Sequence, residues 1–380
     1  MRPVHCRPGE KYQICSVSFS IISLVLLWTK LPLQHQVRFK ENLYGLRFHT
    51  FNFITFLSAL YQLFLFLKSI KLYFFLHIKC CSIFWCAHKN LLSFIVMFIE
   101  FDEPWRPVTW SGANKEDMLQ KLRALQVSVP DVNRLNILLH GPIGAGKSSF
   151  INSVNTVLQG HNTTAALADS SAGKSYSFTV KFKYHRLKKG APGIFYPFSF
   201  ADIMGLEPGS SSGVHIEDIV HVLNGRIKSG YVFNPVSPIA EGNPSYNSEP
   251  SLKDRVHCLV SVLPADNISL ISNEVIQKMK DVREKARNLD IPQVVLMSMV
   301  DKACPLVNDD LKKIYTSKKI KDKMKECRDK LGVPMNCIYP VRNYHEQVTN
   351  DLLQDVLILM PISDIIRFAN SYVEDQVYTE

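Results

Sequence analysis

Short apolar runs alternate with segments of helical periodicity over the last two thirds of the chain. The runs that resemble buried strands lie at 134–140, 194–200, 256–263, 293–301 and 336–341. Segments with apolar residues at helical spacing lie at 148–158, 272–289, 309–331 and about 350–372. An alternation of polar and apolar residues at 175–184 predicts one half-buried edge strand. Strands that alternate with helices predict an α/β fold in which helices cover both faces of a mostly parallel sheet.

The first hundred residues follow a different pattern. Apolar stretches lie at 17–28, 51–67 and 91–101, and the first is shorter than the ~20 residues that a membrane-spanning helix needs. Lys68 and Lys71 interrupt the apolar sequence after the second stretch, and lysine in mid-membrane is costly. Three interpretations stay open: a membrane-associated region, a packed soluble subdomain, or a segment that is not a natural folded part of the protein.

Charge separates the same two regions. The formal net charge is +10, and the first hundred residues contribute +8 of it, from eleven Lys/Arg and three Asp/Glu. Both signs are mixed along the predicted helices of the remainder, so the sequence predicts no nucleic-acid groove. The nine cysteines show no metal-ligand spacing, and we expect reduced thiols in a cytosolic protein.

The run at 134–140 leads directly into a glycine-rich loop, Gly141-Pro142-Ile143-Gly144-Ala145-Gly146-Lys147-Ser148-Ser149. The loop matches G-x-x-x-x-G-K-[ST], with a strand before it and a helix after it. Its main-chain N–H groups and the helix N-terminus favour a bound phosphate. Lys147 is expected to reach the β- and γ-phosphates, and Ser148 to bind Mg²⁺. The pattern predicts a P-loop NTPase domain, a three-layer sandwich, at 134–375, after a hydrophobic segment at 1–100 and a connecting segment at 101–133.

A second phosphate element follows the strand predicted at 194–200. It is Asp202-Ile203-Met204-Gly205, the Asp-x-x-Gly pattern that GTPases place at the end of a strand. Asp202 is expected to bind Mg²⁺ through water, and the amide of Gly205 to face the γ-phosphate.

The base-reading element is predicted at Ser298-Met299-Val300-Asp301. GTPases usually have Asn/Thr-Lys-x-Asp there, and the aspartate accepts two hydrogen bonds from guanine N1 and N2. Ser298 begins this pattern and Asp301 fits the aspartate, whereas Met299 replaces the lysine that packs over the base. The other interpretation of Asp301 is an ordinary strand-end or helix-capping residue. The loop Arg342-Asn343-Tyr344 after the last strand is expected to flank the base.

The residues needed for hydrolysis are incomplete. The position after Asp-x-x-Gly, often a water-orienting Gln, is Leu206, and Glu207 could substitute only if the loop turned differently. The candidates for a threonine that covers Mg²⁺ are Thr163, Thr164 and Thr179. We therefore predict weak or no hydrolysis, with a loop at 207–213 that orders when nucleotide binds.

Three other functions stay open. The chain could be an active GTPase whose catalytic group comes from self-association or from a partner. It could be an ATP-dependent P-loop enzyme, which would prefer ATP and need an acceptor site. It could also be an interaction module whose P-loop is vestigial, although the intact Gly146-Lys147-Ser148 argues against that function.

Taken together, these motifs resemble the interferon-induced protein 44 family. The resemblance covers roughly residue 101 to the end, including Pro104-Trp105-Arg106-Pro107-Val108-Thr109-Trp110, the P-loop, Asp202 to Gly205, Val300-Asp301-Lys302-Ala303-Cys304-Pro305 and Val341 to Tyr344. It implies a cytoplasmic protein of the innate antiviral response that binds GTP/GDP with Mg²⁺. Membrane contact through residues 1–100 is left open, and these residues do not resemble the additional N-terminal domain of longer members.

Overall fold

The computed structural model describes residues 99–163, 181–209, 212–345, 347 and 349–378. The chain divides between Ile99 and Glu100 into two units, and all strands and helices named below belong to the second. The apolar stretches at 17–28 and 51–67 lie outside the described residues, as do Thr164 and Thr179.

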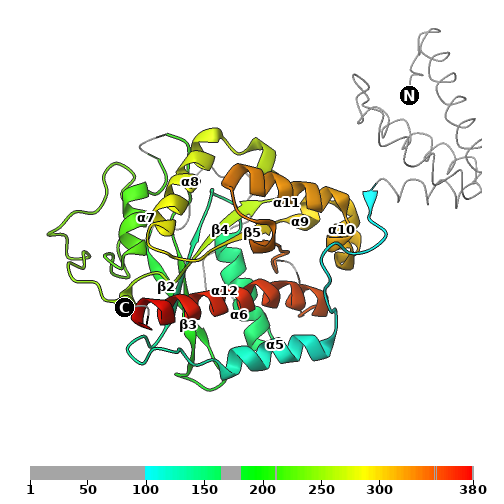
Figure 1. The fold of residues 1–380 in the computed structure, drawn as a ribbon, viewed down its shortest axis with the longest axis horizontal. Coiled ribbons are helices and arrows are strands. Elements are labelled where there is room, and N and C mark those ends of the chain that lie inside the picture. The colour runs from blue at the N-terminus through cyan, green and yellow to red at the C-terminus, as the bar shows by residue number, and fades with distance from the viewer. Residues whose placement is uncertain (1–98, 164–180, 210–211, 346, 348, 379–380) are drawn as a thin grey trace, which may run out of the picture. The chain divides into compact units, whose positions relative to one another are not determined.

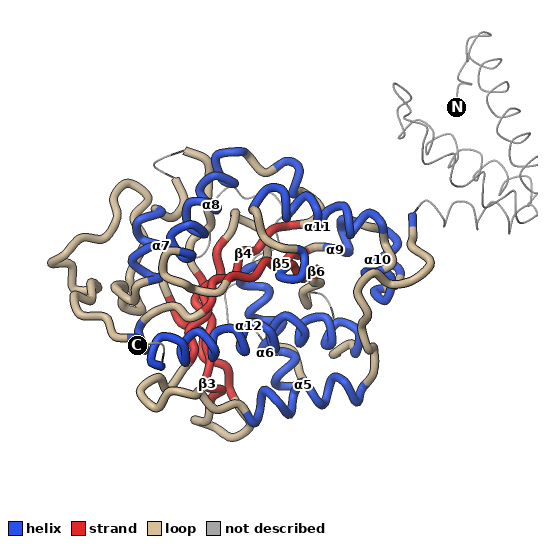
Figure 2. The backbone as a smooth tube through the Cα atoms, in the orientation of Figure 1, coloured by secondary structure: helices blue, strands red, loops and turns tan. Residues whose placement is uncertain are grey.

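Six strands form one sheet in the order β2-β3-β1-β4-β5-β6 (Figures 1 and 2). They are β1 (Leu135–His140), β2 (Lys183–Lys188), β3 (Phe195–Asp202), β4 (Cys258–Pro264), β5 (Gln293–Ser298) and β6 (Ile338–Pro340). β2 pairs antiparallel with β3, and the other neighbouring strands pair in parallel. The predicted α/β fold with a mostly parallel sheet is confirmed, and each predicted apolar run overlaps one of the parallel strands.

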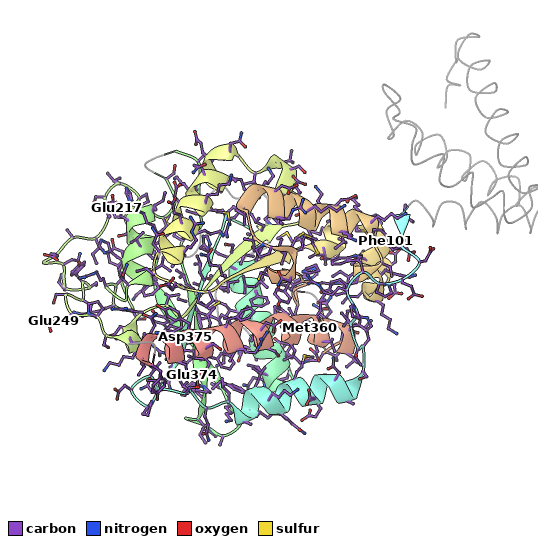
Figure 3. All side chains as sticks on the ribbon, viewed as in Figure 1. Phe101, Glu217, Glu249, Met360, Glu374 and Asp375 are labelled. Atoms are coloured by element: carbon purple, nitrogen blue, oxygen red, sulfur yellow. The ribbon has the colours of Figure 1, made fainter. Side chains whose placement is uncertain are left out.

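Helices cover both faces of this sheet. One layer holds α5 (Gly112–Ala124), α6 (Lys147–Gln159) and α12 (Leu352–Tyr378), and the other holds α7 (Ile216–Leu223), α8 (Asn273–Arg287) and α11 (Lys318–Leu331). Every residue of β1 and β4 is buried, as expected of parallel strands enclosed on both faces. Side chains fill the space between the layers (Figure 3).

Local sequence signals explain where several helices begin. The hydroxyl of Ser272 accepts from the amide of Val275 to cap α8, and Ser317 accepts from Ile320 to cap α11. α6 differs, because it starts after Gly146 in the left-handed conformation and has no side-chain cap. Its first-turn amides are therefore not satisfied by a capping side chain, which suits an anion.

Several predicted boundaries are wrong. Residues 175–180 of the strand predicted at 175–184 lie outside the described residues. The described edge strand β2 begins within the predicted range at Lys183 and continues to Lys188, beyond the predicted end. The helix predicted at 309–331 is broken into α10 (Pro305–Asp309), a 3-10 helix (Leu311–Tyr315) and α11. The breaks occur where Asp310 caps the 3-10 helix and Ser317 starts a new helix.

Further differences concern helices that the pattern missed or shortened. α12 continues to Tyr378, beyond the predicted end at 372, and α5 and α7 were not predicted. The run at 293–301 ends as a strand at Ser298, because Met299 has a φ of 55° and opens the short helix α9 (Val300–Ala303). Short 3-10 helices also lie at Leu252–Asp254, Ile268–Leu270 and Met335–Cys337.

The connecting segment is attached to the rest of the domain by hydrogen bonds and by an ion pair. Arg106 donates hydrogen bonds of 2.9 Å and 2.7 Å to the carbonyls of Ile338 and Met335, beside β6. Lys115 on α5 forms a 2.7 Å ion pair with Asp355 on α12, whose side chain is fully buried. α5 thus covers α12 and continues the helical layer on that face (Figure 1).

The part of the chain that the structure describes contains no helix with the length and apolar character needed to cross a membrane.

The four cysteines of the described part are free thiols, as expected from their spacing: Cys258, Cys304 and Cys327 are buried and Cys337 is partly buried. Burial raises the pKa of the Cys258 and Cys327 thiols, so these side chains are unreactive core residues.

Candidate nucleotide-binding site

The carboxyl ends of the parallel strands bring the predicted site residues to one edge of the sheet. Asp202, the last residue of β3, lies in register with Leu139 of β1. Ser298, the last residue of β5, lies in register with Pro264 at the end of β4. Since the glycine-rich loop follows β1 directly, the predicted phosphate and base elements meet where α/β proteins bind their ligands.

The glycine-rich loop has a backbone path that side chains would obstruct. Gly141 has a φ of 151°, and a Cβ atom there would lie 2.2 Å from the carbonyl oxygen of Val262 in β4. Gly144 and Gly146 have φ values of 70° and 88°. The loop can therefore curl tightly between β1 and α6, as a phosphate-binding loop does.

Lys147 folds back over this loop. Its Nζ donates to the carbonyls of Gly141 and Pro142 at 3.3 Å and 3.2 Å, and the residue is only 7% exposed. Burial lowers the pKa of Lys147, and the nearby Asp202 carboxylate opposes that shift. A buried ammonium group beside main-chain amides and a helix N-terminus is suited to a phosphate group.

A neutral histidine lies directly before the glycine-rich loop, at the end of β1. His140, the last residue of β1, is fully buried, and its Nε2 lies 2.7 Å from the hydroxyl of Ser261 in β4. Burial, together with the positive charges of Lys147 and Arg283, lowers the pKa of His140 to about 3. His140 therefore adds no positive charge next to Lys147 at neutral pH.

The residues predicted to bind Mg²⁺ are in direct contact. The hydroxyl of Ser148 donates to a carboxylate oxygen of Asp202, which is 2% exposed. These oxygen groups fit Mg²⁺, which usually takes one or two protein ligands and completes its shell with phosphate and water. Among the described residues no three His, Cys, Asp or Glu side chains form a metal-holding group. Ser149 lies in the same helical turn, where its carbonyl accepts from Ser153 at 2.8 Å.

Two side chains tie the base side of the site to the glycine-rich loop. The hydroxyl of Ser298 donates to the carbonyl of Ala145 at 2.6 Å. The hydrogen of this hydroxyl is therefore already used in a bond within the protein. The side-chain amide of Asn343 donates to the carbonyl of Gly146 at 3.2 Å. The segments after β5 and β6 are thus attached to the loop that would hold the phosphates.

The predicted base reader lies in a short helix beyond β5. Asp301 is in α9, and its Oδ2 lies 4.0 Å from the Nε of Arg342. The side chains of Asp301 and Arg342 are 12% and 22% exposed. Met299, which stands where GTPases usually have lysine, is the left-handed residue that connects β5 to α9.

The Asp-x-x-Gly segment packs directly on the glycine-rich loop. A Cβ atom on Gly205 would lie 2.6 Å from the Cγ1 of Ile143 and 2.9 Å from its main-chain nitrogen. The amide of Leu206 donates to the carbonyl of Gly141 at 3.0 Å, and Leu206 is 1% exposed. The position of a water-orienting Gln is therefore occupied by a buried aliphatic side chain beside Ile143.

The segment after Leu206 is held by α8. Lys278 donates from its Nζ to the carbonyls of Glu207 and Gly209 at 2.8 Å and 2.6 Å, and Glu274 accepts from the amide of Gly209 at 2.9 Å. Desolvation raises the pKa of the Glu207 carboxyl, and the charge of Lys278 opposes the rise. The two α8 side chains thus fix the described beginning of the predicted loop at 207–213.

Other sequence candidates lie elsewhere. Thr163 accepts from the side chain of Asn155 at 2.7 Å, on the C-terminal half of α6 rather than beside Ser148.

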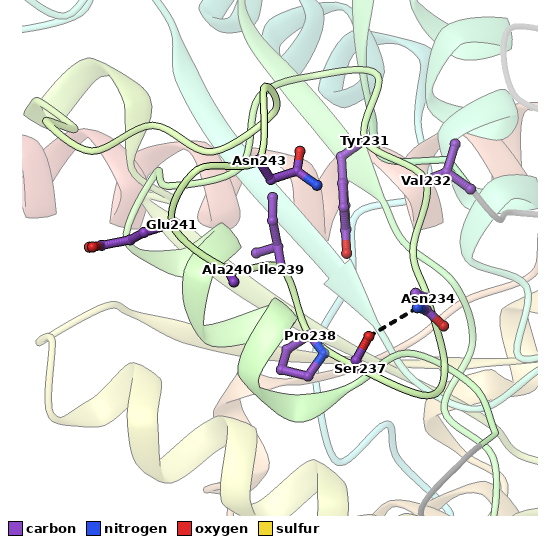
Figure 4. Close-up of a pocket in the computed structure, with 9 residues that line it drawn as sticks. All are labelled: Tyr231, Val232, Asn234, Ser237, Pro238, Ile239, Ala240, Glu241 and Asn243. Atoms are coloured by element: carbon purple, nitrogen blue, oxygen red, sulfur yellow. Dashed lines mark hydrogen bonds between the residues drawn. The ribbon is translucent and has the colours of Figure 1, made fainter.

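A shallow hollow of about 440 Å³ lies in the segment between α7 and β4, where Asn234 donates to Ser237 at 3.0 Å (Figure 4). The residues that line it all come from 231–243, so the hollow is separate from the glycine-rich loop.

Sequence reasoning found only some of the residues that form contacts at this site. The loop with Arg342 and Asn343 was expected beside the base, because it follows a predicted strand at the same sheet edge. Glu274 and Lys278 had no such signal, since they look like ordinary exposed positions of an amphipathic helix. Their role depends on how α8 packs beside the segment after Gly205.

Comparison with known proteins relates the chain to one family. No family model matches it. Interferon-induced protein 44 of Homo sapiens is 34% identical over 261 residues, which cover 69% of this chain and 58% of that protein. Interferon-induced protein 44-like of Homo sapiens is 31% identical over 262 residues, which cover 69% and 57% of the two chains. This chain therefore spans about three fifths of the length of the curated relatives it matches.

Among solved structures, Toc33 from Arabidopsis thaliana in complex with GDP and Mg²⁺ matches with a TM-score of 0.38 and 14% identity. The match covers 67% of this chain and 92% of Toc33, and no conclusion about this chain rests on it. The family follows from the sequence relatives, whose identity extends over more than two thirds of the chain. Over this matched part, the chain belongs to the interferon-induced protein 44 family.

Proposed function

We propose that this chain is a guanine-nucleotide-binding regulatory protein of the interferon-induced antiviral response, with weak or no hydrolysis of its own. The observation that carries the proposal is the placement of Lys147 within the glycine-rich loop, beside the Ser148–Asp202 pair. A buried ammonium group, a helix N-terminus and two oxygen ligands for Mg²⁺ together suit a nucleoside triphosphate. Asp301 at the same sheet edge supports guanine as the base.

Weak hydrolysis follows from the side chains beside the expected γ-phosphate. Leu206 is buried, and its amide is bonded to Gly141, so this residue has no polar group with which to orient water. Ile143 packs against Gly205 and adds a second aliphatic side chain at the same place. Hydrolysis depends on positioning and charge stabilisation, and neither Leu206 nor Ile143 supplies them. The described environment therefore favours binding over turnover.

The binding test uses the full-length chain and fluorescent analogues of GTP and ATP, with Mg²⁺ or with EDTA. We expect saturable binding of the GTP analogue, weaker binding of the ATP analogue, and loss of affinity in EDTA. Lys147→Ala should abolish binding, whereas Lys280→Ala, which changes an exposed lysine on α8, should not. Ser148→Ala should bind GTP with reduced dependence on Mg²⁺. Equal binding of ATP would remove the guanine assignment, and binding of neither would leave an interaction module.

Turnover separates the proposal from an active GTPase that is stimulated by self-association. Phosphate release per protein molecule is measured over a range of protein concentrations with saturating GTP. We expect slow release that does not depend on protein concentration. A rate that rises with concentration would show that a second copy supplies the missing catalytic group.

A further inference from the structure

The ion pair between Arg342 and Asp301 joins two segments at the base side of the site. Arg342 follows β6 and Asp301 lies in α9, and 4.0 Å separates Nε of the first from Oδ2 of the second. The Nε atom of Arg342 is buried and, within the described part of the chain, has no hydrogen-bond partner. The charge of Asp301, the predicted base reader, therefore holds the guanidinium nearby. The Nε–H group remains available to donate a hydrogen bond to a ligand.

The backbone around Arg342 is fixed on both sides. The amide of Val341 donates to the carbonyl of Met297 in β5 at 2.8 Å, which extends the sheet pairing. Asn343 donates to the carbonyl of Gly146, and the amide of Tyr344 donates to the hydroxyl of Ser153 at 2.9 Å. Because its neighbours are anchored to the sheet and to α6, Arg342 stays at the base side of the glycine-rich loop.

The residue that usually supplies a cation at this side is absent. Met299 stands at that position, and its thioether is only a weak acceptor. Arg342 brings a cation to the same carboxylate from a different strand end. In protein–DNA complexes, arginine commonly recognises guanine by donating to the O6 and N7 acceptors, which adenine does not present together.

We propose that Arg342 is a specificity-determining residue that donates hydrogen bonds to O6 and N7 of a bound guanine. Asp301 accepts from N1–H and the 2-amino group of the same base. The two side chains thus contact different groups of the guanine ring. In the protein without ligand, the two charges neutralise each other, which limits the cost of keeping them partly buried. This inference rests on the proposed guanine-nucleotide site and names the residue that completes its selectivity.

The test compares nucleotides that differ from GTP by one recognition group each. The full-length chain is titrated with GTP, with 6-thio-GTP, which weakens the O6 acceptor, and with 7-deaza-GTP, which removes N7. ITP, which lacks the 2-amino group, reports on Asp301. The proteins are the unchanged chain, Arg342→Ala, Arg342→Lys, Asp301→Asn and the control Arg328→Ala on the exposed face of α11.

We expect the unchanged chain and the control to prefer GTP over 6-thio-GTP and 7-deaza-GTP by about fivefold or more. Arg342→Ala should reduce both preferences to less than about twofold, while its preference for GTP over ITP persists. Arg342→Lys should keep part of the preference, because it retains one cationic donor. Asp301→Asn should reduce the preference for GTP over ITP.

Three outcomes would overturn the inference. If Arg342→Ala weakens GTP and both analogues equally, or changes none of them, Arg342 does not read the base and the proposed guanine site still stands. If the unchanged chain does not distinguish GTP from either analogue, the O6 and N7 contacts do not exist. If it binds no nucleotide, both the inference and the proposed function fail. Thermal melting of each variant confirms that it is folded.

Discussion

The side-chain amide of Asn343 donates a 3.2 Å hydrogen bond to the main-chain carbonyl of Gly146. Gly146 is the left-handed residue that precedes α6, and Asn343 belongs to the loop after β6. Ser153 on α6 reinforces the connection by accepting from the amide of Tyr344 at 2.9 Å. The conformation of the phosphate side of the site is thereby linked to the position of the base side.

Asn343→Ala should weaken nucleotide binding without unfolding the protein. The variant removes the hydrogen bond to Gly146, worth about 1 kcal/mol, and a longer one of 3.5 Å that Asn343 accepts from the hydroxyl of Ser153, so we expect GTP affinity to fall about fivefold. Fluorescence titration with GTP measures the change, and Asn308→Ala, which alters an exposed residue of α10, serves as the control. Equal affinities of the two variants would show that this bond does not preorganise the site.

Lys278→Ala should release the segment after Leu206. The lysine donates to the carbonyls of Glu207 and Gly209, and without these bonds the segment should open more often. We expect amide hydrogen exchange at Leu206, Glu207 and Gly209 to become about tenfold faster, in line with the loss of roughly 1–2 kcal/mol. Lys280→Ala on the same helix should leave the exchange unchanged. If both variants exchange alike, packing rather than Lys278 holds the segment.

Lys115→Ala should destabilise the domain, because it removes the ion-pair partner of the buried carboxylate of Asp355. Asp355 is fully buried and accepts from the hydroxyl of Tyr344 at 2.7 Å, and Lys115 is its ion-pair partner. Removing the cation leaves the carboxylate without its counter-ion, which costs about 3 kcal/mol. Lys121→Ala, which breaks an exposed pair with Asp117 on the same helix, should cost less than about 1 kcal/mol. Urea denaturation of the two variants measures both values, and similar losses would contradict the assigned role of α5.

His257 should make stability depend on pH below neutrality. Its Nδ1 accepts from the amide of Asn136 at 2.9 Å, and its Nε2 lies 2.9 Å from the carbonyl of Leu252, so the ring is held neutral. Burial lowers the pKa of His257 in the folded protein to about 4, whereas an unfolded histidine has a pKa of about 6.5. The stabilisation is therefore complete above pH ~6.5 and is lost as the pH falls toward 4.

At pH 5 this difference should cost about 2 kcal/mol of unfolding free energy relative to pH 7.5. The fully buried His140, with a folded pKa of about 3, should add a loss of the same sign. His257→Gln should lose about 2 kcal/mol less than the unchanged chain over this interval, whereas His161→Gln, at an exposed position, should not differ. Urea denaturation at several pH values checks this, and parallel curves for all three proteins would refute it.

Much of the central fold could be predicted because its signals are local. β1, β4 and β5 are mostly apolar and are buried except for Gln293 at the start of β5, and the glycine-rich loop between β1 and α6 is a contiguous motif. Boundaries were less predictable where a single residue decides them. Met299 ends β5 by adopting a left-handed conformation, and Ser317 restarts a helix inside a segment with continuous helical periodicity.

The connecting segment shows the limit of such patterns. Its helix α5 was not predicted, because its sequence lacks a strong apolar face, with only Met118, Leu119 and Leu122 buried. The helix is positioned instead by Lys115 and by packing against α12. Ser111 caps this helix locally, and tertiary packing holds it in place.

The sequence by itself determined the parallel strands and several of the helices between them, the glycine-rich loop with Lys147 and Ser148, and the candidacy of Asp202 and Asp301. These features depend on residues close together in the chain, where periodicity and loop chemistry act directly.

The tertiary structure alone decided which distant side chains meet: Arg342 with Asp301, Asn343 with Gly146, and Lys278 with the segment after Leu206. Such pairs depend on the order of strands in the sheet and on which helix covers which face. Those arrangements arise from burying the whole apolar surface at once, which local sequence patterns do not encode.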